Sequence, residues 1–317
     1  MLNRCHRLLA RRISGTSQTC RNLFLRDKHS SAELHDDSSR TITDFLTPNR
    51  VDLLNLTLEP YVPQHTIGTR ADTLPPGFHF IFFPTSTSEL ETLQDGYEKH
   101  FAPKEPFKRR LWTQGTLDFR GEGLKLSEWA ECVENLLRVE GDENKTDVWI
   151  ERKMFNSWTS REAENWSVKE IRCLRYLTDL SREPEEPATS SSISAAHHNE
   201  PILEHRFTPT QILLTRFSYL THNFHRIHID RDYAGKVEGY PNTLVHGSLS
   251  ITIILKVLQQ FHNDSLAIRH ARYVMYRPLY VDSPVKLLMY RTKPDRMRVR
   301  LLNSSNEKAV ECSIWHD

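Results

Sequence analysis

The sequence predicts an α+β fold in which a curved antiparallel sheet wraps around one central helix. Residues 248–261 are apolar around most of a helical circumference, which is typical of a helix enclosed by other structure. Strand-like segments follow at 271–276, 285–292, 296–301 and 310–314. The last two alternate apolar and polar residues on either side of a polar turn, which indicates an antiparallel hairpin.

The N-terminal part has weaker patterns. Strand character is found at 147–155 and 168–177, and a helix is predicted over 127–139, where the initial serine could cap the first turn. The Leu-Pro-Pro-Gly string at 74–77 predicts a turn or an extended approach. Residues 27–50 are polar and are expected to connect a leader to the folded part.

Residues 181–200 divide the chain. They are rich in Ser, Pro and Glu and have no apolar periodicity, so they cannot bury enough surface to offset the entropy of ordering. We therefore expect a linker at 181–200 between an N-terminal unit, 51–180, and a C-terminal unit, 201–317. No internal repeat is visible in the letters, so a duplication would have to be argued from strand order.

The first 30 residues differ from the rest of the chain. Six arginines precede the first acidic residue, Asp27, and Arg4, Arg7 and Arg11 recur at helical spacing. A basic amphipathic stretch near Ser and Thr predicts a mitochondrial targeting segment over 1–30. The alternative is a basic tail without structure.

Composition argues against several classes of function. The chain has 42 Lys and Arg against 41 Asp and Glu, which gives no broad basic surface for nucleic acid. No apolar run approaches the ~18 residues of a transmembrane helix. The five cysteines are far apart and lack Cys-x-x-Cys spacing, which argues against a disulfide framework or a cysteine zinc site.

The segment 217–247 is the densest in polar chemistry. His222, His225 and His228 recur every third residue, and His246 precedes the glycine that opens the apolar helix. Three histidines on one helix face could bind a metal, but no acidic ligand sits at a typical interval and a Tyr-Pro-Asn turn interrupts the segment. We therefore predict no metal and no cofactor, and we interpret His222 as structural.

These residues fit the chemistry of an acyl thioester. A base with a pKa near ambient pH must move a proton at the carbon beside the carbonyl, and His228 is the candidate. The carbonyl oxygen gains negative charge, which N–H groups at the helix start of Gly247 can stabilise. A further polar group must hold water or a departing hydroxyl, and Asn223 or His225 is available for this.

At these positions the chain resembles the MaoC-like hotdog hydratases and dehydratases. The strings that carry the resemblance are N-F-H-R-I-H at 223–228 and V-H-G-S at 245–248. They are most similar to a subgroup that includes fungal mitochondrial 3-hydroxyacyl-thioester dehydratases type 2 and mesaconyl-C4-CoA hydratases. The strings L-P-P-G-F-H-F at 74–80 and R-R-L-W at 109–112 also resemble that subgroup.

The resemblance implies a double hotdog whose N-terminal half is degenerate and completes an acyl tunnel. It implies that His228 is the catalytic histidine, that Gly247 supplies the N–H that polarises the thioester carbonyl, and that Asn223 stands where the family has aspartate. Asparagine cannot accept a proton as a base, but it can orient a water or a hydroxyl. Residues expected to contact the substrate are His225, Arg226, His246 and Ser248.

The implied reaction is dehydration of (3R)-3-hydroxyacyl thioesters to trans-2-enoyl thioesters in mitochondrial type II fatty acid synthesis. The substrate would be carried on acyl carrier protein or CoA. The sequence leaves open whether the chain forms a homo-oligomer. One alternative is a CoA-thioester hydratase of dicarboxylic acids, with Arg226 or Arg110 pairing the free carboxylate. Others are a non-catalytic acyl-binding subunit, which the asparagine at 223 motivates, and a thioesterase, for which no attacking group can be assigned.

Overall fold

The computed structural model describes residues 33–63, 72–85, 87–104, 107–142, 144–157, 165–179, 200–263 and 266–317. The predicted targeting segment lies outside these residues, as does nearly all of the predicted linker. Within the described ranges, no helix is long and apolar enough to cross a membrane.

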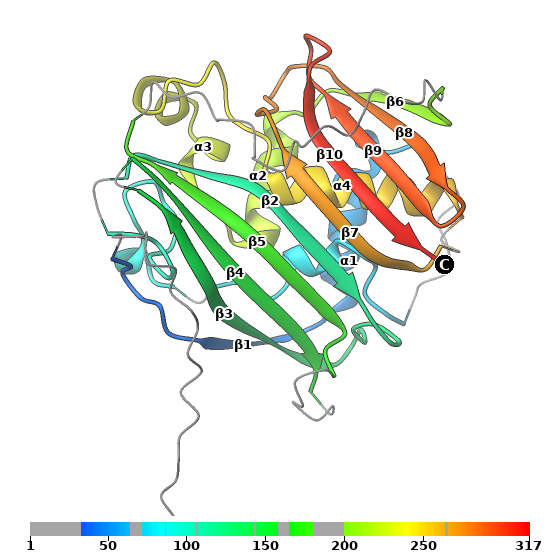
Figure 1. Cartoon of the computed structure of the whole chain (residues 1–317), viewed down its shortest axis with the longest axis horizontal. Coiled ribbons are helices and arrows are strands. Elements are labelled where there is room, and N and C mark those ends of the chain that lie inside the picture. The colour runs from blue at the N-terminus through cyan, green and yellow to red at the C-terminus, as the bar shows by residue number, and fades with distance from the viewer. Residues whose placement is uncertain are drawn as a thin grey trace, which may run out of the picture.

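The described strands form a single ten-stranded antiparallel sheet, which sweeps across the molecule in Figure 1. The strands predicted at 147–155, 168–177, 271–276, 285–292, 296–301 and 310–314 are confirmed as β4, β5, β7, β8, β9 and β10. The full set is β1 (Arg40–Phe45), β2 (Arg109–Phe119), β3 (Trp129–Gly141), β4 (Lys145–Asn156), β5 (Val168–Leu177), β6 (Leu203–Phe207), β7 (Ile268–Met275), β8 (Val285–Lys293), β9 (Arg296–Leu302) and β10 (Lys308–His316).

The strand order reveals a duplication that the letters hide. From one edge to the other, the order is β1-β3-β4-β5-β2-β7-β10-β9-β8-β6. In each half the first strand forms the outer edge, the second lies at the centre, and the third, fourth and fifth lie between them. The two second strands, β2 and β7, pair antiparallel from Gln114 with Val274 to Asp118 with His270. The chain is therefore two copies of one five-stranded unit joined through a continuous sheet, as the predicted double hotdog requires.

The helices gather on one face of this sheet, behind it in the view of Figure 1. The apolar run at 248–261 is confirmed as helix α4, and most of its circumference is buried. The α-helices are α1 (Pro48–Leu58), α2 (Gln211–Thr221), α3 (Arg226–Ile229) and α4 (Gly247–Phe261). Shorter helical turns are η1 (Glu59–Tyr61), η2 (Phe78–Ile81), η3 (Glu89–Glu91) and the π-helical η4 (Tyr233–Val237).

The Pro-Pro-Gly string forms the predicted turn and brings the N-terminal half onto α4. Phe78 N donates to Pro75 O at 3.0 Å, and Gly77 has a left-handed φ of +87°. A Cβ on Gly77 would lie only 3.0 Å from Leu255 Cδ1, so a side chain there would crowd the central helix. Thr252 Oγ1 donates to Gly77 O at 3.3 Å, which ties the turn to α4.

Two expectations for the N-terminal half are wrong. The helix predicted over 127–139 is strand β3, and Ser127 does not cap a helix but has a φ of +64°. The Glu- and Leu-rich composition favours helix locally, but pairing with β1 and β4 prevails. Residues 27–50 are more than a connector, because β1 and the start of α1 lie within them, before the expected boundary at 51.

Candidate active site

His228 lies on the short helix α3 and is buried. Its Nδ1 donates to the carbonyl of Leu244 at 2.8 Å, so Nδ1 carries the hydrogen and Nε2 is left with a lone pair. Nε2 has no hydrogen bond within the described residues, and the ring lines the larger of two cavities. Gln211 Nε2 donates to the backbone carbonyl of His228 at 3.0 Å and fixes the short helix. His228 is thus held as a base that faces a cavity.

His246 stacks on His228, with ring centroids 3.7 Å apart and 21° between the planes. Its Nε2 shares a hydrogen bond of 2.8 Å with Ser218 Oγ on α2, while its Nδ1 is buried without a hydrogen bond. The stack and the serine together restrict the orientation of both rings.

Both rings are kept neutral. Burial, to which the charges of His225 and Arg110 add, lowers the pKa of His228 to about 3. Burial also lowers the pKa of His246 well below its ordinary value, and His228 and His225 contribute in the same direction. The pKa of His228 therefore lies below the near-neutral value expected of the base, and its free Nε2 is uncharged at neutral pH.

Helix α4 begins at Gly247, beside His228. Its N-cap residue, His246, has an extended backbone and makes no side-chain capping bond, so the first N–H groups of the helix stay available. Val245 N donates to Leu279 O at 2.8 Å, which fixes the segment that leads into the helix. A Cβ on Gly247 would lie 3.5 Å from Trp112 and from Met275, in ordinary contact. The helix start therefore presents N–H donors to the cavity wall, where an oxyanion could be stabilised.

Asn223 and His225 occupy the loop between α2 and α3. Asn223 Oδ1 accepts the backbone N–H of His225 at 3.1 Å, which leaves the side-chain amide to donate. Asn223 lines both cavities, and His225 lines the larger one. The rings of His225 and His228 are 5.6 Å apart and nearly perpendicular, at 87°. Both side chains thus line the cavity that the ring of His228 faces.

The larger cavity has a volume of about 450 Å³ and is built from both halves of the chain. The C-terminal half contributes the loop, α3 and the start of α4, and the N-terminal half contributes β2. Its charged and aromatic lining from β2 includes Arg109, Arg110 and Trp112. The size is typical of a small-molecule site, and its position at the junction of two units is also typical.

A smaller cavity of about 100 Å³ lies beside the first, and the two share Tyr97, Trp112, Asn223 and Ser248. Its apolar lining includes Phe80, Phe82 and Phe83, and its charged lining includes Glu98, Glu134, Arg152 and Arg172. Trp112 is thus part of the wall of both cavities.

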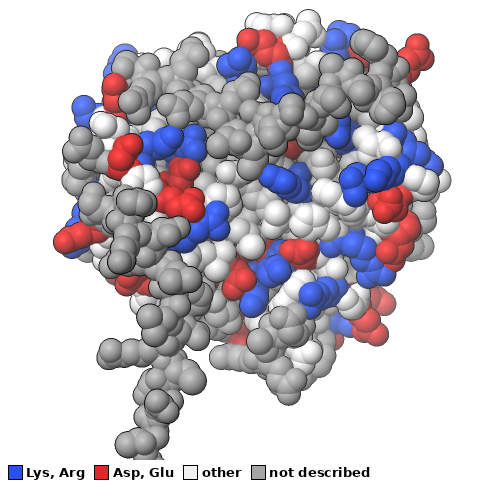
Figure 2. Space-filling model, in the orientation of Figure 1, with Lys and Arg blue, Asp and Glu red and all other residues white. Residues whose placement is uncertain are grey.

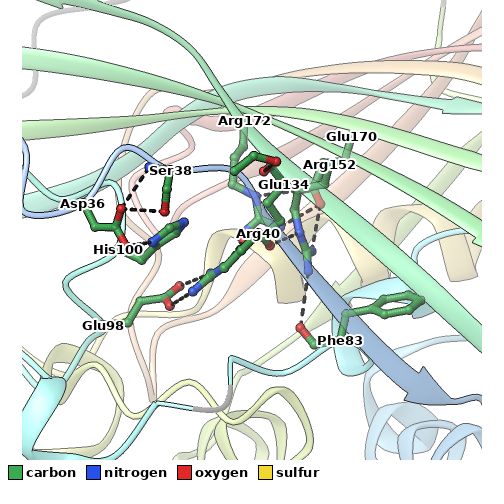
Figure 3. Close-up of polar contacts among 11 residues, drawn as sticks. Asp36, Ser38, Arg40, Phe83, Glu98, His100, Glu134, Arg152, Glu170 and Arg172 are labelled. Atoms are coloured by element: carbon green, nitrogen blue, oxygen red, sulfur yellow. Dashed lines mark hydrogen bonds and ion pairs between the residues drawn. The ribbon is translucent and has the colours of Figure 1, made fainter. Parts of the chain in front are cut away.

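A buried charge network forms the base of the smaller cavity (Figure 3). Arg152 pairs with Glu134 at 2.6 Å and with Glu170 at 3.2 Å, and Arg172 donates twice to Glu170, at 2.7 and 2.8 Å. Arg40 joins Glu134 to Glu98. Against the effect of burial, Arg172 and Arg152 lower the pKa of Glu170 to about 2, so the carboxylate stays charged. Each acid of the network, Glu98, Glu134 or Glu170, therefore has at least one arginine partner, so no carboxylate in it is left unpaired.

The structure brings most of the predicted site residues together. Those that line the cavities are Asn223, His225, His228, His246, Gly247 and Ser248. Arg226 does not belong to this group, because its side chain is 45% exposed, pairs with Asp230 at 2.8 Å and lines neither cavity. Its expected contact with substrate is therefore not supported. His222 ends α2 in a left-handed conformation and lines the smaller cavity.

Three residues at the site were not singled out from the sequence: Asp95, Tyr97 and Ser218. Asp95 and Tyr97 belong to an irregular Asp-Gly-Tyr loop, and no periodicity connects this loop to segment 217–247. Ser218 lies on the buried side of α2, where a serine is a weak signal. Only the three-dimensional structure brings them to His225 and His246.

Charges on the surface are mixed in sign. Figure 2 shows Lys and Arg interspersed with Asp and Glu on the face drawn. Among the described residues, no group of three or more His, Cys, Asp or Glu side chains is arranged to hold a metal ion.

Comparisons with known proteins agree with this geometry. Residues 77–281 match the hydroxyacyl-thioester dehydratase type 2 family. The chain is 29% identical to the mitochondrial hydroxyacyl-thioester dehydratase type 2 of Schizosaccharomyces pombe, over 79% of this chain and 90% of that protein. It is 25% identical to mesaconyl-C(4)-CoA hydratase of Chloroflexus aurantiacus, over 80% of this chain and 87% of that protein.

A solved MaoC-like dehydratase from Phytophthora capsici has the same fold, with a TM-score of 0.59 and 11% identity. The match covers 88% of this chain and 94% of that one. The family match spans well over half of the chain and includes the loop, α3 and the start of α4. The chain therefore belongs to the hydroxyacyl-thioester dehydratase type 2 family, on a double hotdog fold.

Proposed function

We propose that this chain removes water from (3R)-3-hydroxyacyl thioesters to give trans-2-enoyl thioesters, in mitochondrial type II fatty acid synthesis. The observation that carries the proposal is the pairing of a base with a helix start. His228 Nε2 is neutral and unbonded, and the N–H groups at Gly247 lie beside it in one cavity. Membership of the dehydratase type 2 family supports the same reaction.

The roles follow from the chemistry of elimination. His228 Nε2 removes the proton from C2, beside the thioester carbonyl. Negative charge builds on the carbonyl oxygen and is stabilised by the N–H of Gly247 and by the positive end of the α4 dipole. The hydroxyl on C3 departs from the side of the cavity where Asn223 and His225 lie, and the free amide of Asn223 donates to its oxygen.

The location and the carrier of the substrate are part of the proposal. Two curated relatives are named as mitochondrial proteins, and the arginine-rich segment 1–30 has the composition of a targeting sequence. The substrate would be delivered as a thioester of acyl carrier protein or CoA, since either carrier presents the same acyl and thioester groups to the cavity.

A hydration assay tests the proposal. The purified chain should consume crotonyl-CoA, which is followed by the loss of enoyl-thioester absorbance. His228→Ala should reduce kcat by ~10²–10⁴. His270→Ala is the matched control, because His270 pairs with Asp118 and packs against Trp315 on a partly exposed strand surface, and it lines neither cavity. Absence of turnover in wild type, or full activity in His228→Ala, would refute the proposal.

Hydration of dicarboxylic CoA thioesters is a second candidate, favoured by the relationship to mesaconyl-C(4)-CoA hydratase. The arginines expected to hold the free carboxylate argue against it, because Arg226 pairs with Asp230 and Arg110 pairs with Asp95. A panel of crotonyl, octenoyl and mesaconyl thioesters on CoA and on acyl carrier protein decides between the two. Preference for mesaconyl-CoA would favour the second candidate.

A further inference from the structure

A loop of the N-terminal half reaches the catalytic motif of the C-terminal half. Asp95 O accepts the backbone N–H of Arg226 at 2.8 Å. The next residue, Gly96, has a φ of +81°, and a Cβ there would lie 2.6 Å from the carbonyl oxygen of Phe224. Only glycine permits this close approach. The loop is therefore fixed against the segment that carries His225.

The side chain of Asp95 points at His225. One oxygen, Oδ1, accepts the N–H of Tyr97 at 3.0 Å, while Oδ2 accepts from Arg110 and lies 3.4 Å from His225 Nε2. Glu238 Oε1 lies 3.8 Å from the same nitrogen. Although burial opposes it, the charges of Arg110 and His225 lower the pKa of Asp95 below its ordinary value. His225 thus has two carboxylates on its far side.

The near side of His225 is open to substrate. Neither ring nitrogen of His225 makes a hydrogen bond with a described residue. Nε2, on the carboxylate side, is buried, and the ring lines the larger cavity, 5.6 Å from the ring of His228. His228, in contrast, has a backbone carbonyl on its far side and no carboxylate in ion-pair range. The two imidazoles in this cavity therefore differ in environment. His225 is placed to carry a proton, and His228 is placed to accept one.

Charged groups from several elements surround His225. Asp95 and Glu238 lie 3.4 and 3.8 Å from its Nε2, and Arg109 and Arg110 from β2 line the same cavity. Arg110 is already bound to Asp95, and Arg109 lies 3.7 Å from Glu238. Each arginine is thus paired with an acid, and the rings of His228 and His246 are kept neutral by burial.

We propose that His225 is the acid that protonates the departing hydroxyl, and that Asp95 is the residue that positions it. This inference rests on the proposed dehydration. It explains how the site works with asparagine at position 223, where the family has aspartate: the carboxylate comes from the other half of the chain, and it acts through a histidine.

The step balances without a further reactant. His228 Nε2 takes the proton from C2, and the electron pair of that C–H bond forms the C2–C3 double bond. The C3–O bond breaks with its pair remaining on oxygen, and the proton on His225 Nδ1 converts the hydroxide to water. At the end of the step His228 holds one proton more, and His225 one proton fewer, than at the start. Water in the cavity carries a proton from His228 back to His225 before the next turnover.

A change of leaving group separates an acid from a structural residue. Chloride departs without a proton, whereas hydroxide needs one. We therefore compare elimination from (3R)-3-hydroxybutyryl-CoA and from the matching 3-chlorobutyryl-CoA, using the full chain and the variants Asp95→Asn and His225→Gln. Both variants should lose ~10²-fold or more in rate with the hydroxy substrate and stay within about threefold of wild type with the chloro substrate.

Controls keep the result interpretable. Asp95→Glu should recover part of the lost rate, because a carboxylate is restored. Asp147→Asn removes an acid from a similar arginine pair, with Arg175, away from the cavities, and should affect both substrates little. Equal losses with both substrates, or no loss with the hydroxy substrate, would overturn the inference alone. A wild-type chain that turns over neither substrate would overturn the proposed function as well.

Discussion

The rings of His228 and His246 stack face to face, 3.7 Å apart, and a serine on another helix holds the outer ring in place. Stacking of two imidazoles at this distance requires that the two are not charged at once, because two cations would repel one another in a dry environment. The burial that lowers both pKa values therefore favours the contact. The orientation of the proposed base thus depends on His246, which Ser218 holds in place.

Ser218→Ala should disturb this arrangement. The change leaves His246 with both ring nitrogens buried and unbonded, which should reduce the free energy of unfolding by about 1–3 kcal/mol. It should also lower kcat, because His228 loses a fixed neighbour. Urea denaturation and the crotonyl-CoA assay measure the two effects. Thr215→Ala, on the exposed side of the same helix, is the control, and equal behaviour of the two variants would contradict the prediction.

Gly247→Pro should remove the proposed oxyanion donor while keeping the helix. Proline is tolerated at the first position of a helix, and the extended backbone of His246, with ψ of 138°, suits a residue before proline. We expect a loss of ~10²–10³ in kcat with little change in far-UV circular dichroism. Gly247→Ala keeps the N–H and places its Cβ in ordinary contact, so it should lose less. Equal losses in both variants would mean that crowding, not the N–H, is responsible.

Arg152→Met should test the buried charge network. Arg152 is the link between Glu134 and Glu170, and its loss leaves two buried acids with less compensation. We expect the free energy of unfolding to fall by about 3–5 kcal/mol, measured by urea denaturation. Arg138→Met breaks a pair with Glu140 that is about 40% exposed and should cost about 1 kcal/mol or less. A small effect at Arg152 would show that the network is not needed for stability.

Acid should destabilise the chain at unusually mild pH. Burial lowers the pKa of both His79 and His228 to about 3, so below the unfolded value of 6.5 the unfolded chain takes up protons that the folded chain does not. Their contribution is complete above pH 6.5 and falls by about 1.4 kcal/mol per histidine and pH unit as the pH drops toward 3. Glu170 adds a loss in the same direction between pH 4.5 and about 2.

Urea denaturation at pH 7.5, 6.5 and 5.5 measures the slope of the free energy of unfolding against pH. His246, whose pKa burial also lowers, adds to the same loss. His79→Gln should reduce the slope, because one of these three buried histidines is removed without a change to the proposed base. If the free energy of unfolding is the same at pH 7.5 and 5.5, these histidines are not buried in neutral form as described.

The parts of the fold and of the site that can be predicted from the sequence are those marked by a pattern of neighbouring residues. The apolar run of α4 marks the helix, and the glycine before it marks a helix start that a ligand can approach. Alternation identifies β9 and β10. Where composition and pairing disagree, as in β3, the residues alone favour the wrong element, because Glu134 is buried by a partner, Arg152, that the sequence does not connect to it.

Other parts depend on contacts between distant segments. The acid beside His225 comes from a loop more than a hundred positions earlier, and only the approach of Gly96 to Phe224 brings it there. The duplication is likewise a property of strand order, not of residue identity. Neither could be obtained from periodicity or from a motif.

The continuous sheet through β2 and β7 has an evolutionary consequence. In an association of two identical five-stranded units, every substitution would appear in both, so a change that shapes the substrate channel would also alter the base. In one chain that holds both units, each unit mutates alone. Here the proposed catalytic residues lie in one unit, while the other supplies aromatic wall residues, the buried ion pairs and Asp95. If the proposed roles hold, selection can act on substrate preference in one unit and on bond chemistry in the other.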